Sequence, residues 1–212
     1  MAGTSTARAA RRHKRAYRMQ SRATSAAATR VRVLEAATRL FMDLSYDRVS
    51  LADVARHARV SLPTVLRKFG SKDALFLECA RLVSEKELEA RHVPPGDVRA
   101  AARVLARRYE QILPFWKRHL DLEERFPTVA RVVEGARRSH LAWLAKVFAP
   151  FLATRTGPTR TRQLAALFGA TEIYLWWSWR AHLGLSAADA EQVLVELLET
   201  LVQRWTAASK GE

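Results

Sequence analysis

The sequence predicts an all-α protein in two parts, for three reasons. Beyond residue 30, apolar residues recur every three to four positions, which is the period of a helix with one buried face. No segment alternates apolar and polar residues with the period of two that marks a strand. Proline and glycine separate stretches of helix length, as at Pro94-Pro95-Gly96 and Gly157-Pro158. We therefore expect an N-terminal helix-turn-helix domain of three helices, joined by a linker helix to a larger helical domain.

Residues 1–29 are predicted to be a basic, disordered N-terminal arm. They contain seven arginine and lysine residues, no acidic residue and few large apolar side chains. Such a segment cannot bury enough apolar surface to order itself. Two roles remain open: an arm that follows DNA phosphates or enters the minor groove, and a solvated tail.

The first helix of the main domain is expected from Arg30 to Leu44, where an apolar stripe runs through the whole segment. A second helix is expected after Ser50, because Asp53 stands three residues on and the pair resembles a capping box. The apolar residues of this second helix share one face, at Leu51, Val54, Ala55 and Ala58.

A third, shorter helix follows a break at Arg59-Val60. Ser61 can cap it, and Pro63 fits its first turn, where a missing N–H costs nothing. Val65 and Phe69 repeat at i and i+4 and are expected to face inward. The remaining outer face is partly basic, which suits a helix that enters the DNA major groove. The alternative is an ordinary pair of packed helices. The candidate DNA contacts are Ser50, Ser61, Leu62, Pro63, Thr64, Leu66, Arg67, Lys68 and Lys72.

The outer residues have different expected roles. Thr64 is expected to bond a base edge or to touch a thymine methyl, with apolar help from the two residues before it. Arg67 or Lys68 is expected to reach guanine or a phosphate, and the sequence leaves open which of them does. Ser50 and Lys72 are expected at phosphates, Lys72 with the help of the N–H groups at the start of its helix.

The segment from Thr29 to Leu77 carries a specific set of residues in a specific order. They are Leu34-Glu35-Ala36-Ala37, Leu40-Phe41, Tyr46, Ser50-Leu51, Asp53-Val54-Ala55, Val60-Ser61, Thr64 and Phe69-Gly70-Ser71-Lys72-Asp73-Ala74-Leu75-Phe76. With these residues the chain resembles the N-terminal domain of TetR-family transcriptional regulators. The rest of the chain resembles that family only in character.

Three positions depart from the family pattern. Arg59 and Ser45 stand where the family commonly has glycine, and a left-handed arginine costs on the order of 1 kcal/mol relative to glycine. Leu66 stands where the family commonly has an aromatic residue, often tyrosine, that reaches a phosphate. This puts one backbone contact in doubt, and the neighbouring Arg67-Lys68 is a candidate replacement.

The domain boundaries are expected at 30–92 for the helix-turn-helix domain with its linker helix and at 93–208 for the second domain. The linker helix is expected from Lys72 to Arg91, ahead of the Pro-Pro-Gly break. In the second domain, a first helix is expected to begin near Val98 and to be kinked or ended by Pro114. A short, partly acidic segment is expected from Phe115 to Phe126. Three further helices are expected at Thr128–Thr154, at Thr159–Leu183 and from the Ser186 cap to Ala208.

By resemblance, the second domain is expected to bind an effector and to form a homodimer. All six tryptophans lie beyond residue 115, and aromatic groups with a few polar ones line many ligand pockets. The candidate pocket residues are Tyr109, Trp116, Phe126, Trp143, Phe168, Glu172 and Trp176. The candidate dimer residues lie on the apolar stripes of the last two expected helices, at Leu164, Leu167, Leu194, Leu197, Leu201 and Trp205. Plain core packing within one chain is the alternative for both sets.

Several classes of function have little support in the sequence. The six histidines are scattered without a metal-ligand spacing, and no nucleophile motif or glycine-rich phosphate loop is present. We therefore expect no enzyme, metal or cofactor. The single cysteine, Cys79, cannot form an intrachain disulfide, and no apolar run is long enough to span a membrane.

The charge agrees with a DNA-binding protein. The chain has 36 lysine and arginine residues against 21 acidic ones, a formal net charge of +15, which attracts polyanions. By resemblance, we expect a cytoplasmic, nucleoid-associated dimeric repressor that binds double-stranded DNA at an inverted-repeat operator and is released by a small, largely apolar effector. Release would follow from a shift of the linker helix that changes the spacing of the two recognition helices, roughly 34 Å on B-DNA. The alternatives are a non-specific architectural DNA-binding protein and a regulator without a ligand.

Overall fold

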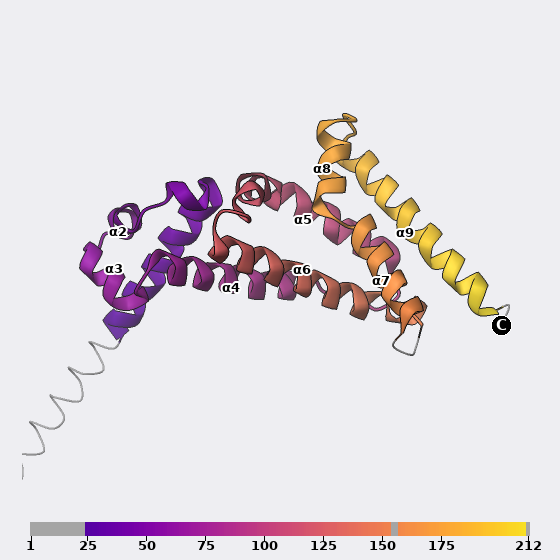
Figure 1. The fold of residues 1–212 in the computed structure, drawn as a ribbon, viewed down its shortest axis with the longest axis horizontal. Coiled ribbons are helices and arrows are strands. Elements are labelled where there is room, and N and C mark those ends of the chain that lie inside the picture. The colour runs from indigo at the N-terminus through magenta and orange to yellow at the C-terminus, as the bar shows by residue number, and fades with distance from the viewer. Residues whose placement is uncertain (1–23, 154–156, 211–212) are drawn as a thin grey trace, which may run out of the picture. The chain divides into compact units, whose positions relative to one another are not determined.

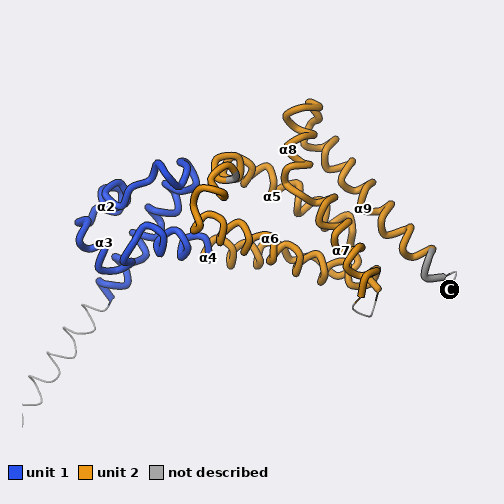
Figure 2. The backbone as a smooth tube through the Cα atoms, in the orientation of Figure 1, with its two compact units in different colours: residues 1–81 blue, residues 82–212 orange. Residues whose placement is uncertain are grey.

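The computed structural model describes residues 24–153 and 157–210, and throughout these residues the regular structure is helical. The chain divides into two compact units, residues 1–81 and 82–212 (Figure 2). Most of the expected basic arm lies outside the described residues. Its last six residues, 24–29, are helical and belong to the first helix, which spans residues 24–43. The predicted C-terminal boundary of the arm was therefore wrong.

In the first unit, that helix is followed by the short 3-10 helix η1 (Tyr46–Arg48), by α2 (Leu51–Ala58) and α3 (Leu62–Phe69), and by the start of α4 (Lys72–Ala90) (Figure 1). The core contains three rings in mutual contact, with Phe41 and Tyr46 each about 5 Å from Phe76 between ring centroids (4.8 and 4.9 Å). Val33, Val54 and Val65 complete it, each with no exposed surface.

Local hydrogen bonds and backbone angles mark the ends of the helices around the turn. The Ser50 hydroxyl accepts a hydrogen bond of 3.1 Å from the Asp53 N–H, which caps α2. Arg59 ends α2 in the left-handed conformation, with φ of 54°, where glycine would be unstrained. Gly70 follows α3 with a positive φ of 77°. The Ser71 hydroxyl then accepts a bond of 3.1 Å from the Ala74 N–H and so caps α4. The residues on either side therefore fix the entry and exit of α3.

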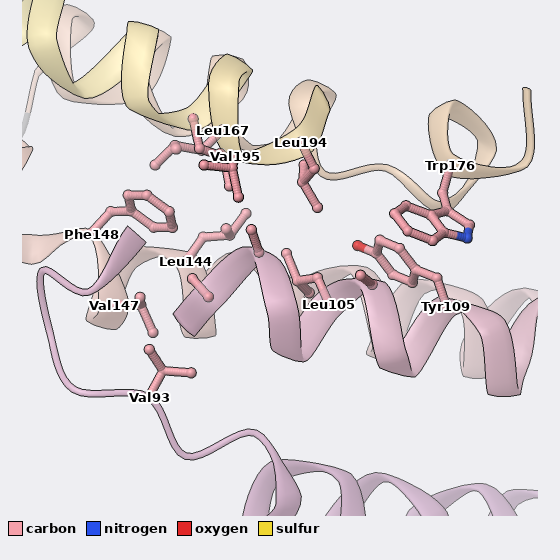
Figure 3. Packing of buried hydrophobic residues seen from close by; sticks show 14 of the residues in the cluster. Val93, Leu105, Tyr109, Leu144, Val147, Phe148, Leu167, Trp176, Leu194 and Val195 are labelled. Atoms are coloured by element: carbon pink, nitrogen blue, oxygen red, sulfur yellow. The ribbon is translucent and has the colours of Figure 1, made fainter. Parts of the chain in front are cut away.

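The second unit contains five long helices in the described part of the chain, joined by short ones. They are α5 (Val98–His119), η2 (Leu120–Leu122), α6 (Pro127–Val147), η3 (Ala149–Phe151), α7 (Pro158–Ala170), α8 (Ile173–Ala181) and α9 (Ala187–Lys210). Helix α5 packs along α9, α7 lies against both α6 and α9, and α8 packs on α5 and α9. Figure 3 shows the buried side chains of Leu105, Leu144, Leu167 and Leu194 meeting between these helices.

Two expected helix boundaries differ from the structure. Of the two alternatives for Pro114, a helix end was wrong, because α5 continues past this proline to His119. The helix expected over Thr159–Leu183 is two helices, α7 and α8. The Thr171 hydroxyl donates to the Leu167 carbonyl at 2.7 Å, and Glu172 is extended, so the chain leaves α7 at this point.

Other boundaries differ less. Helix α6 ends at Val147, ahead of the expected Thr154, and a separate 3-10 turn spans Pro150. Helix α9 begins after Ser186, whose hydroxyl accepts a bond of 3.1 Å from the Asp189 N–H as expected for the cap. Cys79 is buried in the first unit, and burial raises the pKa of its thiol to about 11, so it packs as a small apolar group. Among the helices described, none is both long and apolar enough to cross a bilayer.

Candidate nucleic-acid interface and interior cluster

Helix α3 has a buried back and an exposed front. Val65 and Phe69 are buried, at 0% and 8% exposure. Leu62 and Leu66 are 39% and 43% exposed, so the front of the helix presents two large apolar side chains. Ser61, Pro63 and Arg67 are also exposed, and Thr64 and Lys68 are half-buried. The 3.6-residue period therefore separates the expected DNA contacts from the core, with Thr64 and Lys68 at the border.

The Ser61 side chain does not cap α3. It stands at the N-cap position, but its hydroxyl lies 2.9 Å from the Thr64 hydroxyl and makes no bond to a backbone N–H. The backbone closes the turn instead, since the Thr64 N–H donates to the Ser61 carbonyl at 3.0 Å. The two hydroxyls thus form one polar pair at the exposed start of the helix.

The two basic residues at the end of α3 differ in their surroundings. The Lys68 ammonium donates to the Ala26 carbonyl in the first helix, at 2.8 Å. Arg67 is exposed on the front of α3. The structure therefore gives Lys68 a bond within the protein that the sequence did not suggest.

Lys72 is held at the start of α4. Its ammonium donates to the Tyr46 carbonyl at 3.1 Å and lies 4.3 Å from the centre of the Tyr46 ring. The Tyr46 hydroxyl in turn donates to Asp73. An ammonium has three donors, so the lysine keeps hydrogen-bonding capacity beyond the carbonyl.

Ser50 and Asp53 form a charged cap beside the front of α2. The Ser50 hydroxyl lies 2.6 Å from the Asp53 carboxylate, and Arg56 pairs with the same carboxylate at 2.7 Å. The bond from Ser50 and then that from Arg56 hold the pKa of Asp53 below its usual range. The serine is exposed, so a phosphate can reach it, but its hydroxyl proton is directed to a neighbouring acid.

Arg30 joins three helices of the first unit, and sequence reasoning missed it. Its guanidinium donates to the Lys68 carbonyl at 3.3 Å, forms an ion pair with Glu78 of α4, and lies 4.5 Å from the centre of the Phe69 ring. Its partners stand 38 and 48 residues away in sequence, so no local pattern could have revealed it. Arg30 therefore fixes the C-terminal end of α3 from behind.

The second unit contains a set of polar side chains inside its helical layers, which we call the interior cluster. Its members are Glu87, Arg91, Arg108, Tyr109, His140, Trp143 and Thr171. Tyr109 donates to the Thr171 carbonyl, and His140 Nε2 lies 2.8 Å from the Thr171 hydroxyl. The single proton of that hydroxyl goes to Leu167, so His140 Nε2 is the donor and Nδ1 is an unprotonated acceptor. Nδ1 is buried and has no hydrogen-bond partner.

The basic part of the interior cluster lies near the end of α4. Glu87 Oε2 forms an ion pair with Arg108 Nε and lies 3.8 Å from Arg91 Nε. The Arg91 guanidinium lies 5.6 Å from the centre of the Trp143 ring, and Trp143 donates to the Arg91 carbonyl at 2.9 Å. Burial lowers the pKa of His140 to about 3, and the charge of Arg91 adds to the effect. The histidine is therefore neutral in the folded protein at ordinary pH.

The structure brings several of the expected pocket residues to this cluster. Phe168 lies 5.8 Å from His140 between ring centres, and Figure 3 shows the Tyr109 ring beside that of Trp176, at 5.9 Å. Glu172 is half-buried, which raises the pKa of its carboxyl, and it acts electrostatically on Tyr109. The other two candidates are placed differently: Trp116 is two helical turns beyond Tyr109 on α5, and Phe126 stands at the start of α6.

Two of the six expected dimer residues are buried within the chain. Leu167 and Leu194 have 0% and 1% of their surface exposed and belong to the core of the second unit, so this conformation gives them no surface to offer a partner. Leu197 is 39% exposed, and Leu164, Leu201 and Trp205 are half-buried. The apolar stripe of α9 therefore keeps partly exposed members beyond the core, whereas of the two candidates on α7 only Leu164 keeps accessible surface.

Comparison with known proteins agrees with this geometry. Residues 33–79 match the family model "Bacterial regulatory proteins, tetR family". This chain carries a TetR-family DNA-binding domain. No neighbour among curated proteins was found.

Solved structures extend the similarity to the rest of the fold. A TetR-family transcriptional regulator from Streptomyces coelicolor is 18% identical, with a TM-score of 0.64 over 84% of this chain and 88% of that one. NalD of Pseudomonas aeruginosa, the secondary repressor of the MexAB-OprM multidrug efflux pump, is 20% identical, with a TM-score of 0.54 over 82% of this chain and 96% of that one. At such identities the likeness shows the fold alone. The coarse function is that of a helix-turn-helix transcription regulator, and no enzyme family is indicated.

We expect Arg30→Met to weaken binding to any duplex by about tenfold without changing its salt dependence, because charge-assisted bonds behind α3 are lost and no phosphate contact is. Fluorescence polarisation at several salt concentrations would measure both quantities. Arg39→Met removes the same charge from an exposed position of the same helix and serves as the control. Unchanged affinity in Arg30→Met would remove Arg30 from the support of α3.

We expect the free energy of unfolding to fall as the pH is lowered below about 6.5. In the unfolded chain His140 binds a proton near that pH, whereas in the folded protein its pKa is about 3. This group alone contributes a slope of about 1.4 kcal/mol per pH unit within that window and none above it. Urea unfolding of His140→Gln should show a slope smaller by that amount.

Proposed function

We propose that the protein is a dimeric, cytoplasmic and nucleoid-associated repressor that binds an inverted-repeat operator and leaves it when a small, largely apolar effector binds. One observation carries the proposal: the front of α3 presents exposed Leu62, Leu66 and Arg67 while its back is buried. A two-turn helix arranged in this way fits the recognition helix of a helix-turn-helix. Repression is proposed by analogy, since NalD is a repressor with the same fold.

The contacts to DNA follow from the placement of each side chain. We assign base reading to the front of α3, with the Ser61–Thr64 hydroxyl pair bonding a base edge and Leu62 touching a thymine methyl. Arg67 is assigned the guanine or phosphate contact because it is exposed, while Lys68 is bonded to the first helix. Lys72 and Ser50 are assigned to phosphates, with Lys72 at the N-terminus of α4.

A dimer is proposed because one recognition helix reads only a few base pairs, and a two-fold pair reads an inverted repeat with more affinity and specificity. The surface for it is the outer stripe of α9, made by Leu197 with Leu201 and Trp205. On α8, Tyr174 is 47% exposed and supplies a second large side chain of the kind that interfaces favour.

The effector site is proposed at the interior cluster. Tyr109, Trp143 and Phe168 give it apolar walls, and His140 and Thr171 give it a few polar atoms, which is the usual composition of a ligand site. Helix α4 contributes Glu87 to the cluster and begins at the proposed phosphate contact Lys72. A ligand that shifts α4 therefore acts on the same helix that holds a DNA contact, which is the lever expected for release.

A non-specific architectural protein is the competing function, and the net charge of +15 favours it. Binding-site selection followed by competition decides between the two. We expect the selected duplex to be an inverted repeat and to bind at least about a thousandfold more tightly than a scrambled duplex of the same length. Similar affinity for both duplexes would establish the architectural alternative.

Two neighbouring variants sharpen this test. Arg67→Ala should lose roughly tenfold to a hundredfold of the preference for the selected duplex if its side chain reads a base. Lys68→Ala removes the same charge from the next residue and should leave the preference for each base unchanged. The reverse result, with Lys68 carrying the preference, would contradict the assignment of Arg67.

We expect Leu197→Glu to weaken the dimer by about a hundredfold or more, since it would place a carboxylate in an apolar contact. Sedimentation velocity over a range of concentrations measures the change. Leu141→Glu puts the same charge on α6, at a leucine 36% exposed, and should leave the dimer intact. Dissociation in both variants, or in neither, would place the interface elsewhere.

A further inference from the structure

We propose that the effector is an organic anion, and that its carboxylate displaces Glu87 as the partner of Arg91 and Arg108. This inference deepens the proposed function, because it rests on the interior cluster being the effector site. It names the chemistry of the ligand and the bond that the ligand breaks.

The basic part of the cluster has more donors than its acid can satisfy. Two guanidiniums, with five N–H donors each, pair with the single carboxylate of Glu87. All three side chains are largely buried, at 12% exposure for Arg91, 18% for Arg108 and 21% for Glu87. Arg91 Nε lies 3.8 Å from Glu87, beyond hydrogen-bond distance, and is buried without a hydrogen-bond partner. A second carboxylate here would gain charge-assisted bonds to these guanidiniums.

The surroundings define the rest of the ligand. The Trp143 ring lies beside the Arg91 guanidinium. The His140 ring is stacked with the Trp143 ring, with 6.0 Å between ring centroids and an interplanar angle of 13°. Phe168 extends this aromatic surface on the far side of His140. These rings favour a flat apolar body attached to the acid. The unpaired Nδ1 of His140 accepts one hydrogen bond, so a hydroxyl or N–H on the body would be held there.

Charges on the neighbouring elements orient such a ligand. Glu172, at the start of α8, acts electrostatically on Tyr109. Arg137 of α6 is the cation that acts on Glu172, and it is already paired with Glu123. Arg91 also acts electrostatically on Tyr109, ahead of Glu172, and it acts on His140 as well. A ligand carboxylate is attracted to Arg91 and Arg108 and repelled by Glu172.

Displacement of Glu87 has a mechanical consequence. The ion pair between Glu87 and Arg108 joins α4 to α5. A ligand carboxylate on Arg108 and Arg91 removes that link while neutralising the same guanidiniums. Because α4 continues along the chain into the first unit, the loss of this link changes how the C-terminal half of α4 is held. A neutral molecule of the same shape cannot compete for the arginines in this way.

The experiment compares 1-naphthoate with 1-naphthamide, its neutral counterpart, by isothermal titration of the full-length protein without DNA. We expect the acid to bind at least tenfold more tightly than the amide. In Glu87→Gln, which removes the competing carboxylate at constant volume, the acid should bind about tenfold more tightly still, while the amide is unaffected. In Arg108→Gln the preference for the acid should disappear, and Arg108→Lys should restore part of it.

Glu199→Gln is the matched control, because Glu199 also pairs with an arginine of α5, Arg99, at 2.8 Å but on the surface. It should bind both probes as the parent protein does. The proposal is overturned if Glu87→Gln binds the acid no more tightly than the amide, or fails to bind the acid at millimolar concentration. Specific DNA binding is measured separately, so its failure would refute the regulator and leave the result on the anion standing.

Discussion

The whole recognition surface depends on burying the back of α3. The helix has eight residues, and a helix of two turns is not stable in water by itself. Val65 and Phe69 must therefore be covered, and both are buried within the first unit, in which α2 packs on α3. Arg30 adds a polar fastening at the same place, because one guanidinium contacts the Lys68 carbonyl, the Phe69 ring and Glu78. The exposed leucines on the front are tolerable only because this back face is so firmly held.

The second unit balances a large apolar core against polar groups that the core does not need. Aliphatic and aromatic side chains from α5, α6, α7 and α9 form this core. Burying Arg91, Arg108 and His140 costs desolvation, which the bonds to Glu87 and Thr171 oppose. Buried ionisable groups beside charge partners are candidates for a functional site. The proposal places the effector at the interior cluster for this reason.

How far the sequence predicts the structure can be seen at single residues. The Ser50 cap, the left-handed Arg59 and the inward Val65 all follow from rules that span four residues or fewer, and all are confirmed. Leu167 and Leu194 show where such rules stop. Their stripes were read correctly as apolar faces, but a stripe does not say whether the covering surface belongs to the same chain or to another. The break at Thr171 was missed for a similar reason, since a threonine that bonds its own helix leaves no mark in the periodicity.

The sequence by itself determined the helical class, the helix-turn-helix with the Ser50 cap of α2 and the order of elements around it, because these depend on neighbours along the chain. Only the tertiary structure decided which basic residues are available and which are engaged. Lys68 reaches Ala26, Arg30 reaches Glu78 and Arg108 reaches Glu87, each across an interval that no local pattern encodes. A charged side chain contributes to a site according to the partner it meets in space, and that partner is fixed only when the helices pack.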